Sequence, residues 1–410
     1  MTETFDARDT QSNEKREAAL FERLPKHLSE AVGFAPGLAE HLSGHDLSRL
    51  NSREALASLP VLRKPELMPA QKAKPPFGGF ANQALLAGNR VFLSPGPIWE
   101  PQGAGADPWN GARALHAAGF RSEDVVHNAL AYHMTPGGFI LDEALRALGC
   151  TVFPAGIGNT EMQVEAAQAL QPVAYAGTPD YLKVILDKAN EMGVDLSCIK
   201  RAMVSGGALF PSMRDDYAKR GVEVMQCYAT ADLGVIAYET KSADGLVEGM
   251  LVNEDLIVEI VRPGTGDPVP AGEVGELVVT NFSTTYPLVR FGTGDLSAFI
   301  DAPSPCGRTA PRIRGWMGRA DQRTKVKGMF VDPKQVAQIV ARFDGMEGAR
   351  LVVSREGDSD AMALHYTGEA DPDAVKAALR DITKLGGNAH PVDGLPNDGL
   401  VIEDTRDYKA

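Results

Sequence analysis

A carboxylate on a tight glycine turn is the most informative chemical feature of the chain. Thr293, Gly294 and Asp295 end the strand-like run TYPLVRFGTGD. A carboxylate held on such a turn can accept hydrogen bonds from both hydroxyls of a ribose, and charge-assisted bonds of this kind are strong. Turns of this type are usually structural, so the interpretation depends on what else accompanies this one.

The stretch FLSPGPIWEPQG, from Phe92 to Gly103, has the outline of a phosphate-binding loop. It is a small-residue turn directly after a strand-like run, and phosphate sites need backbone N–H groups that wrap closely around the anion. It also carries three prolines, which lack N–H groups, and Glu100, which is itself an anion. The stretch is therefore a nucleotide grip, the remnant of one, or a simple turn.

Several standard signatures are absent from the sequence. There is no G-x-x-x-x-G-K-[ST], no G-x-S-x-G and no H-E-x-x-H, which argues against a P-loop NTPase, an α/β-hydrolase and a zincin. Gly156-Ile157-Gly158 begins like a dinucleotide fingerprint, but Glu161 stands where the third glycine belongs. We therefore predict a plain strand-to-helix turn there.

Composition limits the class of protein. The chain has 410 residues, 44% of them hydrophobic, which is enough for two or more domains. Its net charge of −13 argues against nucleic acid or an anionic membrane as a partner and favours a small organic ligand. Four separated cysteines without a C-x-x-C pair predict a reduced, cytoplasmic protein without disulfides. No leader and no long apolar run is found, so we expect neither export nor a membrane span.

From Asp124 the chain alternates between strand-like and helix-like segments. Thr178 before Pro179 predicts one helix start, and Thr160 with Gln163 predicts a capping box at another. This alternation is typical of a largely parallel sheet flanked by helices. The predicted strands are 125–132, 150–156, 172–177, 199–207 and 222–228, and the predicted helices are 138–149, 161–171, 180–193 and 212–221.

The two ends of the chain have other characters. The N-terminal part has helical periodicity, with Ser12 as a helix cap. After about Ala237, strands joined by Gly/Pro turns predict a β-rich subdomain. From Gly318, short mixed segments predict a small α+β domain. The predicted fold class is thus α/β, with a large domain at 1–317 and a small mobile domain at 318–410.

Together, TYPLVRFGTGDLSAF and GRADQRTKVKGMFVDPKQV resemble motifs of the adenylate-forming superfamily, in its phenylacetate–CoA ligase-like branch. The resemblance includes LPVLRKPELMPAQKAKPPFGGFA, GGFILDEALRALGCTVFPAGIGNTEMQV, VSGGALFP and CGRT, in the family's order over nearly the whole chain. It implies that a small-molecule carboxylic acid, with an aromatic acid favoured, attacks the α-phosphorus of ATP with magnesium to give an acyl-adenylate and pyrophosphate. The small domain then rotates, and coenzyme A takes the acyl group while AMP leaves.

Carried onto this sequence, the family's motifs assign roles to single residues. Asp295 would hold the ribose hydroxyls, Arg319 would lie near the ribose and phosphate, and Asp321 would be the hinge. Asp232 would be the carboxylate on the magnesium side, and with Arg319 and Asp321 it forms the predicted catalytic set. The other predicted contacts are Ser94 and Gly96 at the phosphates, Ser205, Gly206, Gly207 and Ala208 beside adenine, Tyr228, Ala229 and Thr230 near the nucleotide, and Tyr132, His133 and Thr135 in the acyl pocket.

The phosphate loop departs from the family's Ser-Ser-Gly-Thr-Thr-Gly-x-Pro pattern. Pro95 and Pro97 remove two N–H donors, and Ile98 removes a hydroxyl. Trp99 replaces a glycine, and Glu100 adds negative charge. Each lost bond to a charged phosphate is worth roughly 1.5–3 kcal/mol, so we expect weaker triphosphate binding.

Further departures leave two hypotheses open. Leu400 replaces the family's C-terminal lysine, with only Lys409 nearby, Ala231 replaces a hydroxyl, and Gly292 replaces a basic residue. Cys306 stands alone, so magnesium is the only metal expected. The protein is either an AMP-forming acyl- or aryl-CoA ligase with an adapted loop, or an accessory protein that keeps the fold and pocket but has lost adenylation. The sequence does not decide the acyl group, or between a monomer and a homodimer.

Overall fold

The chain forms two compact units in the computed structural model, which describes residues 3–94, 97–320, 322–357, 359–396 and 400–406. The first unit comprises the chain up to residue 293 together with 297–316. The second unit comprises 294–296 and the chain from residue 317 onward. The predicted hinge residue Asp321 lies outside the described residues.

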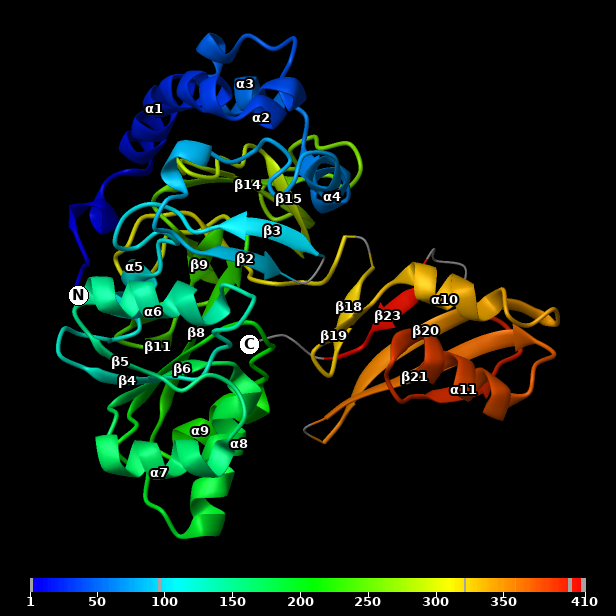
Figure 1. Cartoon of the computed structure of the whole chain (residues 1–410). Coiled ribbons are helices and arrows are strands. Elements are labelled where there is room, and N and C mark those ends of the chain that lie inside the picture. The colour runs from blue at the N-terminus through cyan, green and yellow to red at the C-terminus, as the bar shows by residue number, and fades with distance from the viewer. Residues whose placement is uncertain (1–2, 95–96, 321, 358, 397–399, 407–410) are drawn as a thin grey trace. The chain divides into compact units, whose positions relative to one another are not determined.

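A large twisted sheet forms the centre of the first unit (Figure 1). Its described strands, from one edge to the other, are β5 (Thr151–Pro154), β4 (Val125–Asn128), β6 (Ala174–Gly177), β7 (Arg201–Val204), β8 (Glu223–Thr230), β9 (Gly234–Tyr238), β12 (Met250–Val252), β17 (Arg312–Ile313) and β16 (Phe299–Ile300). The strands from β5 to β8 are parallel, whereas the ladders from β8 to β16 are antiparallel.

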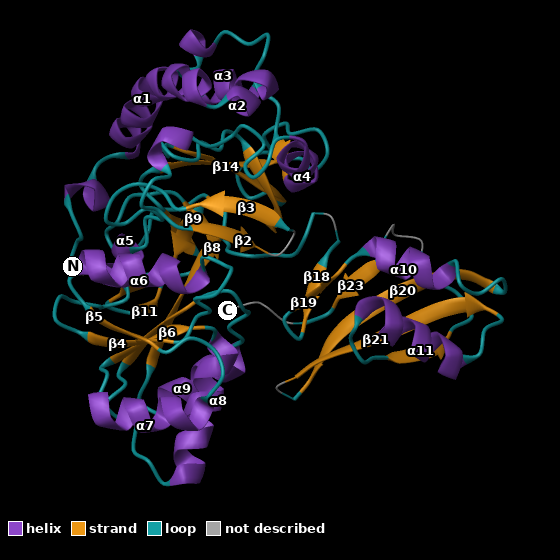
Figure 2. Ribbon diagram, in the orientation of Figure 1, coloured by secondary structure: helices purple, strands orange, loops and turns teal. Residues whose placement is uncertain are grey.

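Helices cover both faces of the parallel strands (Figure 2). They are α5 (Ala112–Ala117), α6 (Gly137–Leu148), α7 (Thr160–Leu170), α8 (Pro179–Met192) and α9 (Pro211–Lys219). Alternate residues of one strand serve opposite cores, because side chains of a strand point to alternate faces. Met203 packs in a cluster with Leu115 and Leu141, whereas Ala202 packs with Leu182. The predicted β-α alternation is confirmed.

The helix start predicted at Thr160 and Gln163 is wrong in detail. The residue before α7 is Asn159, which has φ of 49°. The amide of Gln163 does not reach back to a capping backbone but donates to the carbonyls of Gly156 and Gly158. The left-handed turn exposes these carbonyls to Gln163, and that geometry replaces the capping box.

A β-rich part and N-terminal helices complete the first unit, as predicted. The smaller sheet has the order β1 (Leu62–Arg63), β15 (Phe291–Ser297), β14 (Gly275–Asn281) and β13 (Leu256–Val261), and the hairpins are β2 (Val91–Ser94) with β3 (Ile98–Pro101) and β10 (Lys241–Ser242) with β11 (Gly245–Leu246). The helical elements are η1 (Ala7–Thr10), α1 (Asn13–Phe34), α2 (Pro36–His41), η2 (Leu47–Arg49), α3 (Arg53–Ala57), α4 (Lys64–Ala73) and η3 (Gln83–Leu85). Ser12 caps α1 by accepting from the Lys15 N–H, as its sequence position predicts.

The second unit is a small α+β unit. Its four-stranded sheet among the described residues has the order β22 (Asn388–Pro391), β21 (Ser359–Gly368), β20 (Met346–Glu356) and β23 (Ile402–Asp404). The other elements are the hairpin β18 (Thr324–Val326) with β19 (Met329–Val331), and the helices α10 (Pro333–Val340) and α11 (Pro372–Thr383). Asp332 and Gln335 form a capping box at the start of α10.

Two further features concern the hydropathy of the helices and the state of the cysteines. Across the described ranges, no helix is long and apolar enough to cross a membrane. The four cysteines are free thiols.

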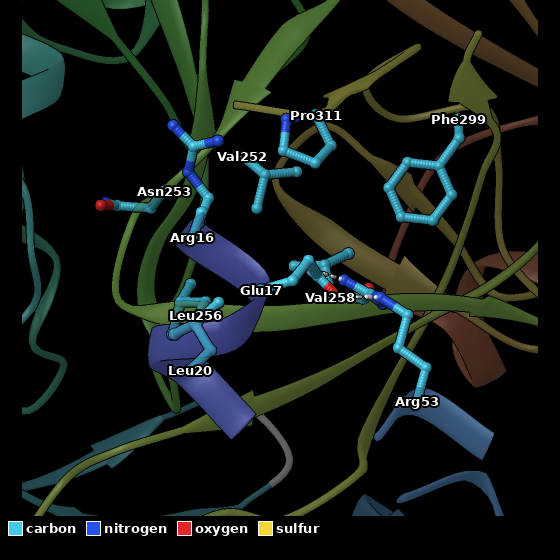
Figure 3. A pocket seen from close by; sticks show the side chains of 10 residues that line it. All are labelled: Arg16, Glu17, Leu20, Arg53, Val252, Asn253, Leu256, Val258, Phe299 and Pro311. Atoms are coloured by element: carbon cyan, nitrogen blue, oxygen red, sulfur yellow. Dashed lines mark hydrogen bonds and ion pairs between the residues drawn. The ribbon is translucent and has the colours of Figure 1, made fainter. Parts of the chain in front are cut away.

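The start of α1 is anchored by buried ions. Arg16 donates from Nε to Glu254 Oε2 at 2.7 Å and from Nη2 to Oε1 at 3.0 Å, and the two residues are 3% and 4% exposed. Arg16 also lines a small pocket in which Arg53 and Glu17 form a second double contact (Figure 3). None of the residues that line this pocket belongs to the predicted site.

Replacing Arg16 with alanine tests this anchor. The change leaves the Glu254 carboxylate buried without its guanidinium. We therefore expect the free energy of unfolding of the first unit, measured in urea, to fall by about 3–5 kcal/mol. Lys26→Ala, on the exposed face of the same helix, is the matched control and should change it little. Equal effects of the two variants would contradict a buried anchor.

Candidate active site

The residues predicted to flank the nucleotide meet at the carboxyl ends of β7 and β8. Because these strands are parallel neighbours, their ends lie at one edge of the sheet, where ligands of α/β proteins bind. The Ser205 hydroxyl donates to the Cys227 carbonyl at 2.9 Å and ties the two ends together. Gly206 has φ of 73°, which glycine adopts without strain. The structure thus places the start of the turn Ser205–Ala208, which includes Gly206, Gly207 and Ala208, beside Cys227, the residue that precedes Tyr228, Ala229 and Thr230 in β8.

The residues predicted for the acyl pocket lie between β4 and α6. The Tyr132 hydroxyl donates to Asp142 Oδ2 at 2.7 Å and accepts from Asn128 Nδ2 at 2.7 Å. Burial, followed by the Asp142 carboxylate, raises the pKa of Tyr132, so the phenol stays neutral. His133 is exposed, and its carbonyl accepts from the Thr135 N–H at 2.8 Å. Tyr132 is therefore the rigidly held member of the three.

Within the FLSPGPIWEPQG stretch, described residues of β2 and β3 pair as antiparallel strands, with Ser94 opposite Ile98. Gly96 lies outside the described residues. Gln71 of α4 accepts from the Trp99 N–H at 2.8 Å and donates to the Trp99 carbonyl at 2.8 Å. One glutamine side chain thus bonds both backbone groups of Trp99 and fixes β3 to α4.

Glu100 belongs to β3 of this hairpin, and its side chain is buried, with only 2% of the residue exposed. Its Oε1 accepts from the Ser94 hydroxyl at 2.7 Å. Burial, followed by the nearby Asp232 carboxylate, raises the pKa of Glu100 well above its usual value. The raised pKa favours the protonated form of Glu100, in which the residue would add no negative charge against a triphosphate.

Asp232 pairs with Lys64, the first residue of α4. Lys64 Nζ lies 2.8 Å from Asp232 Oδ2, and the Asp232 side chain is fully buried. The buried Tyr286 hydroxyl accepts from Gln71 at 3.4 Å, and burial followed by Asp232 and Glu100 raises the pKa of Tyr286 well above its usual value. The cluster therefore contains the Lys64–Asp232 ion pair, the Glu100 carboxyl group and the Tyr286 hydroxyl. Sequence analysis did not single out Lys64, whose only signal was its place at a helix start.

The described residues fit magnesium only as a partner of ATP. No group of three or more His, Cys, Asp or Glu side chains within the described ranges could hold a metal ion. Magnesium is usually held by one or two carboxylates together with substrate phosphates, so a dedicated protein cage is not required. The predicted role of Asp232 beside magnesium stays a prediction, and it requires Asp232 to leave its ion pair with Lys64.

In the second unit, the two residues predicted at the ribose are direct neighbours. Arg319 Nη1 donates to Asp295 Oδ1 at 2.8 Å, and the two backbones form an isolated bridge. Gly294 has φ of 73°, and a Cβ at this position would lie 2.6 Å from Arg319 Nη2. The glycine of the turn is thus required both by its backbone conformation and by the guanidinium beside it.

Two departures from the family pattern have a defined place in the structure. A Cβ at Gly292 would lie 2.7 Å from Glu276 Oε1 and 3.1 Å from Val61, so a basic side chain does not fit unless the neighbours move. Glu276 is already paired with Arg63 at 2.8 Å. Leu400 is 42% exposed, and Lys409 lies outside the described residues.

Comparisons with known proteins agree with this geometry. The family model of AMP-binding enzymes matches residues 109–285. The phenylacetate-coenzyme A ligase of Thermus thermophilus is 30% identical over 87% of this chain and 82% of its own length. That of Pseudomonas putida is 27% identical over 88% of this chain and 84% of its own length.

Solved structures share the fold. A 2-hydroxyisobutyryl-CoA ligase, in complex with 2-HIB-AMP and CoA, superposes with a TM-score of 0.78 at 23% identity, over 98% of this chain and 92% of that chain. The fold and the sequence relationship define an adenylate-forming enzyme. Within that superfamily, the chain belongs to the phenylacetate–CoA ligase branch.

Replacing Glu100 with glutamine tests its protonation. A carboxyl whose pKa is raised by folding binds a proton that the unfolded chain releases, so its contribution to stability falls as pH rises above its unfolded pKa. The free energy of unfolding of the unmodified protein, minus that of Glu100→Gln, should therefore fall between about pH 5 and about pH 8. Urea unfolding across that range measures it. The exposed Glu273→Gln is the control, and a difference for Glu100→Gln that does not vary with pH would show that the buried carboxyl is ionised.

Proposed function

We propose that this protein is an AMP-forming acyl-coenzyme A ligase, an acid–thiol ligase that activates a carboxylic acid as an acyl-adenylate and transfers the acyl group to CoA. The observation that carries the proposal is the relationship to phenylacetate-coenzyme A ligases, which extends over 87% of the chain. Its cofactors are ATP, magnesium and CoA. The comparisons favour this function over the accessory-protein alternative, since the relatives named above are ligases.

Geometry and charge support the nucleotide contacts that the family resemblance implies. Asp295 accepts from the ribose hydroxyls, because its carboxylate sits on a rigid glycine turn and is oriented by Arg319. The turn Ser205–Ala208 and the end of β8 flank adenine, because they occupy the ligand-binding edge of a parallel sheet. Asp321 is the proposed hinge for the thioester-forming step.

The environment of Glu100 in the hairpin reduces the expected charge repulsion between the loop and the triphosphate. An ionised glutamate in the phosphate loop would repel the triphosphate, whereas a neutral acid adds no such repulsion. Burial and the nearby Asp232 carboxylate, which raise the pKa of Glu100, support the neutral form and outweigh the hydrogen bond from Ser94, which favours the ionised one. The prolines and Trp99 still reduce the number of donors, so the hairpin contributes fewer hydrogen bonds to the nucleotide than the family's loop does.

The finer proposals concern the acid and the compartment. An aromatic acid is supported by the names of the relatives and by the Tyr132 and Phe139 rings, which lie edge to face with centroids 5.1 Å apart. The cytosol is supported by the four free thiols, which persist in a reducing compartment. Light scattering distinguishes a monomer from the homodimer that the sequence also allows.

Acid-dependent exchange of labelled pyrophosphate into ATP tests the function. A panel of carboxylic acids that includes phenylacetate should stimulate exchange by the unmodified protein, and CoA should then give the thioester. Aromatic acids should be preferred to acetate. Nucleotide binding without exchange by any acid would favour the accessory protein.

Replacing Asp295 with asparagine tests the ribose contact. Charge-assisted bonds are worth about 1.5–3 kcal/mol, so we expect the KM for ATP to rise by about tenfold or more. The KM for the acid should change little, because the acid does not contact the ribose. Asp301→Asn, at an exposed position, is the matched control. An unchanged KM for ATP would remove Asp295 from the nucleotide site.

A further inference from the structure

The turn between β5 and α7 contains three residues in the left-handed region. Gly156 has φ of 70°, Gly158 of 78° and Asn159 of 49°. A turn of this kind is kept in one shape only when its surroundings hold it. Gln163, 4% exposed, supplies the hold, because its Nε2 donates to the Gly156 carbonyl at 3.0 Å and to the Gly158 carbonyl at 2.7 Å.

The orientation of Gln163 follows from its partners. Carbonyl oxygens only accept, so the amide nitrogen must face the turn and Oε1 must face His127 Nε2, 2.8 Å away. An amide oxygen also only accepts, so His127 carries its proton on Nε2. Burial lowers the pKa of His127, which keeps the ring neutral. The ring stacks on Tyr175 at 6.2 Å, so Gln163 is fixed from the core of the sheet.

The other side of the turn faces the acyl-pocket residues. The Gly156 N–H donates to the Asn128 carbonyl at 3.1 Å, and the Asn128 amide in turn donates to the Tyr132 hydroxyl. A Cβ at Gly156 would lie 4.0 Å from Cδ2 of the Tyr132 ring. The backbone of the turn therefore lies about one methyl group away from van der Waals contact with the aromatic ring.

We propose that Gln163 is a positioning residue for acyl recognition: by holding the turn 156–158 beside Tyr132, it fixes a wall that selects aromatic over short aliphatic acids. This inference rests on the proposed function and deepens it. A flat ring gains dispersion energy only from a wall at contact distance, and a gap of about 0.5–1 Å already loses a quarter to a half of it. A short acid makes few such contacts and depends less on the wall.

Steady-state kinetics of Gln163→Ala and Gln163→Glu test the proposal. The glutamate has the same shape but places an acceptor against two carbonyls, so its effect should be the larger. We expect the ratio of kcat/KM for phenylacetate to that for acetate to fall about tenfold, a loss of about 1.4 kcal/mol in discrimination. The KM for ATP should stay unchanged, since the turn follows β5 rather than β7 or β8. Gln168→Ala, an exposed glutamine on the same helix, is the matched control.

A gentler variant keeps the test valid if Gln163 variants fold poorly. Tyr181→Phe removes only a hydroxyl, which donates to the Gly158 carbonyl at 2.9 Å and accepts from Gln163 Nε2 at 3.2 Å, and it should shift the acid ratio in the same direction by less. Equal losses for both acids, or a lower melting temperature with an unchanged ratio, would overturn the proposal and leave Gln163 a structural role. Absence of acid-dependent exchange by the unmodified protein would instead overturn the proposed function, and this inference with it.

Discussion

The parallel register of β4, β6, β7 and β8 is the constraint on which the large-unit site depends. His127 pairs with Tyr175, and Tyr175 pairs with Ala202, so the carboxyl ends of neighbouring strands fall together. The loops that leave this edge carry the acyl-region tyrosine, the glycine turn after β7 and the end of β8. Helices cover both faces of these strands, so the chemistry resides in the loops while the sheet serves to place them.

Burial raises the pKa of Glu100, the acidic residue of β3 that lies near Asp232 and Lys64. Two carboxyl groups and one ammonium lie together there, and two ionised carboxylates would leave one buried charge uncompensated, which is costly. The raised pKa of Glu100 favours its neutral form, and this form leaves the Lys64–Asp232 ion pair balanced. An acidic residue in the loop of an acidic chain is thereby made compatible with an anionic ligand.

The sequence predicted the elements whose signal is local. The β-α alternation follows from periodicity over several residues, and the Thr-Gly-Asp turn follows from residue type, so both could be predicted. Lys64 and Gln71 could not, because their partners Asp232 and Trp99 are distant in the chain and only the fold brings them together. The raised pKa of Glu100 could not be predicted for the same reason, since it depends on burial and on Asp232.

The capping box predicted at Thr160 and Gln163 is also wrong. The Gln163 side chain bonds groups outside the helix start instead of the capping backbone. Gln163 has the residue type and spacing of a cap, yet its amide bonds the preceding turn and His127 instead. The short strands β22 and β23 went unpredicted, since three or four residues carry too little periodicity to be read. Features that depend on contacts between residues distant in the chain could therefore be identified only in the structure, whereas the fold class could be predicted from the sequence.

The central claim is that this chain, despite its altered loop, joins an acid to CoA by way of an adenylate. Quantifying the nucleotide and thioester products of one reaction with ATP, magnesium, phenylacetate and CoA tests it most directly. The account predicts AMP and acyl-CoA in equal amounts. Formation of ADP with the thioester, or hydrolysis of ATP without any thioester, would contradict it.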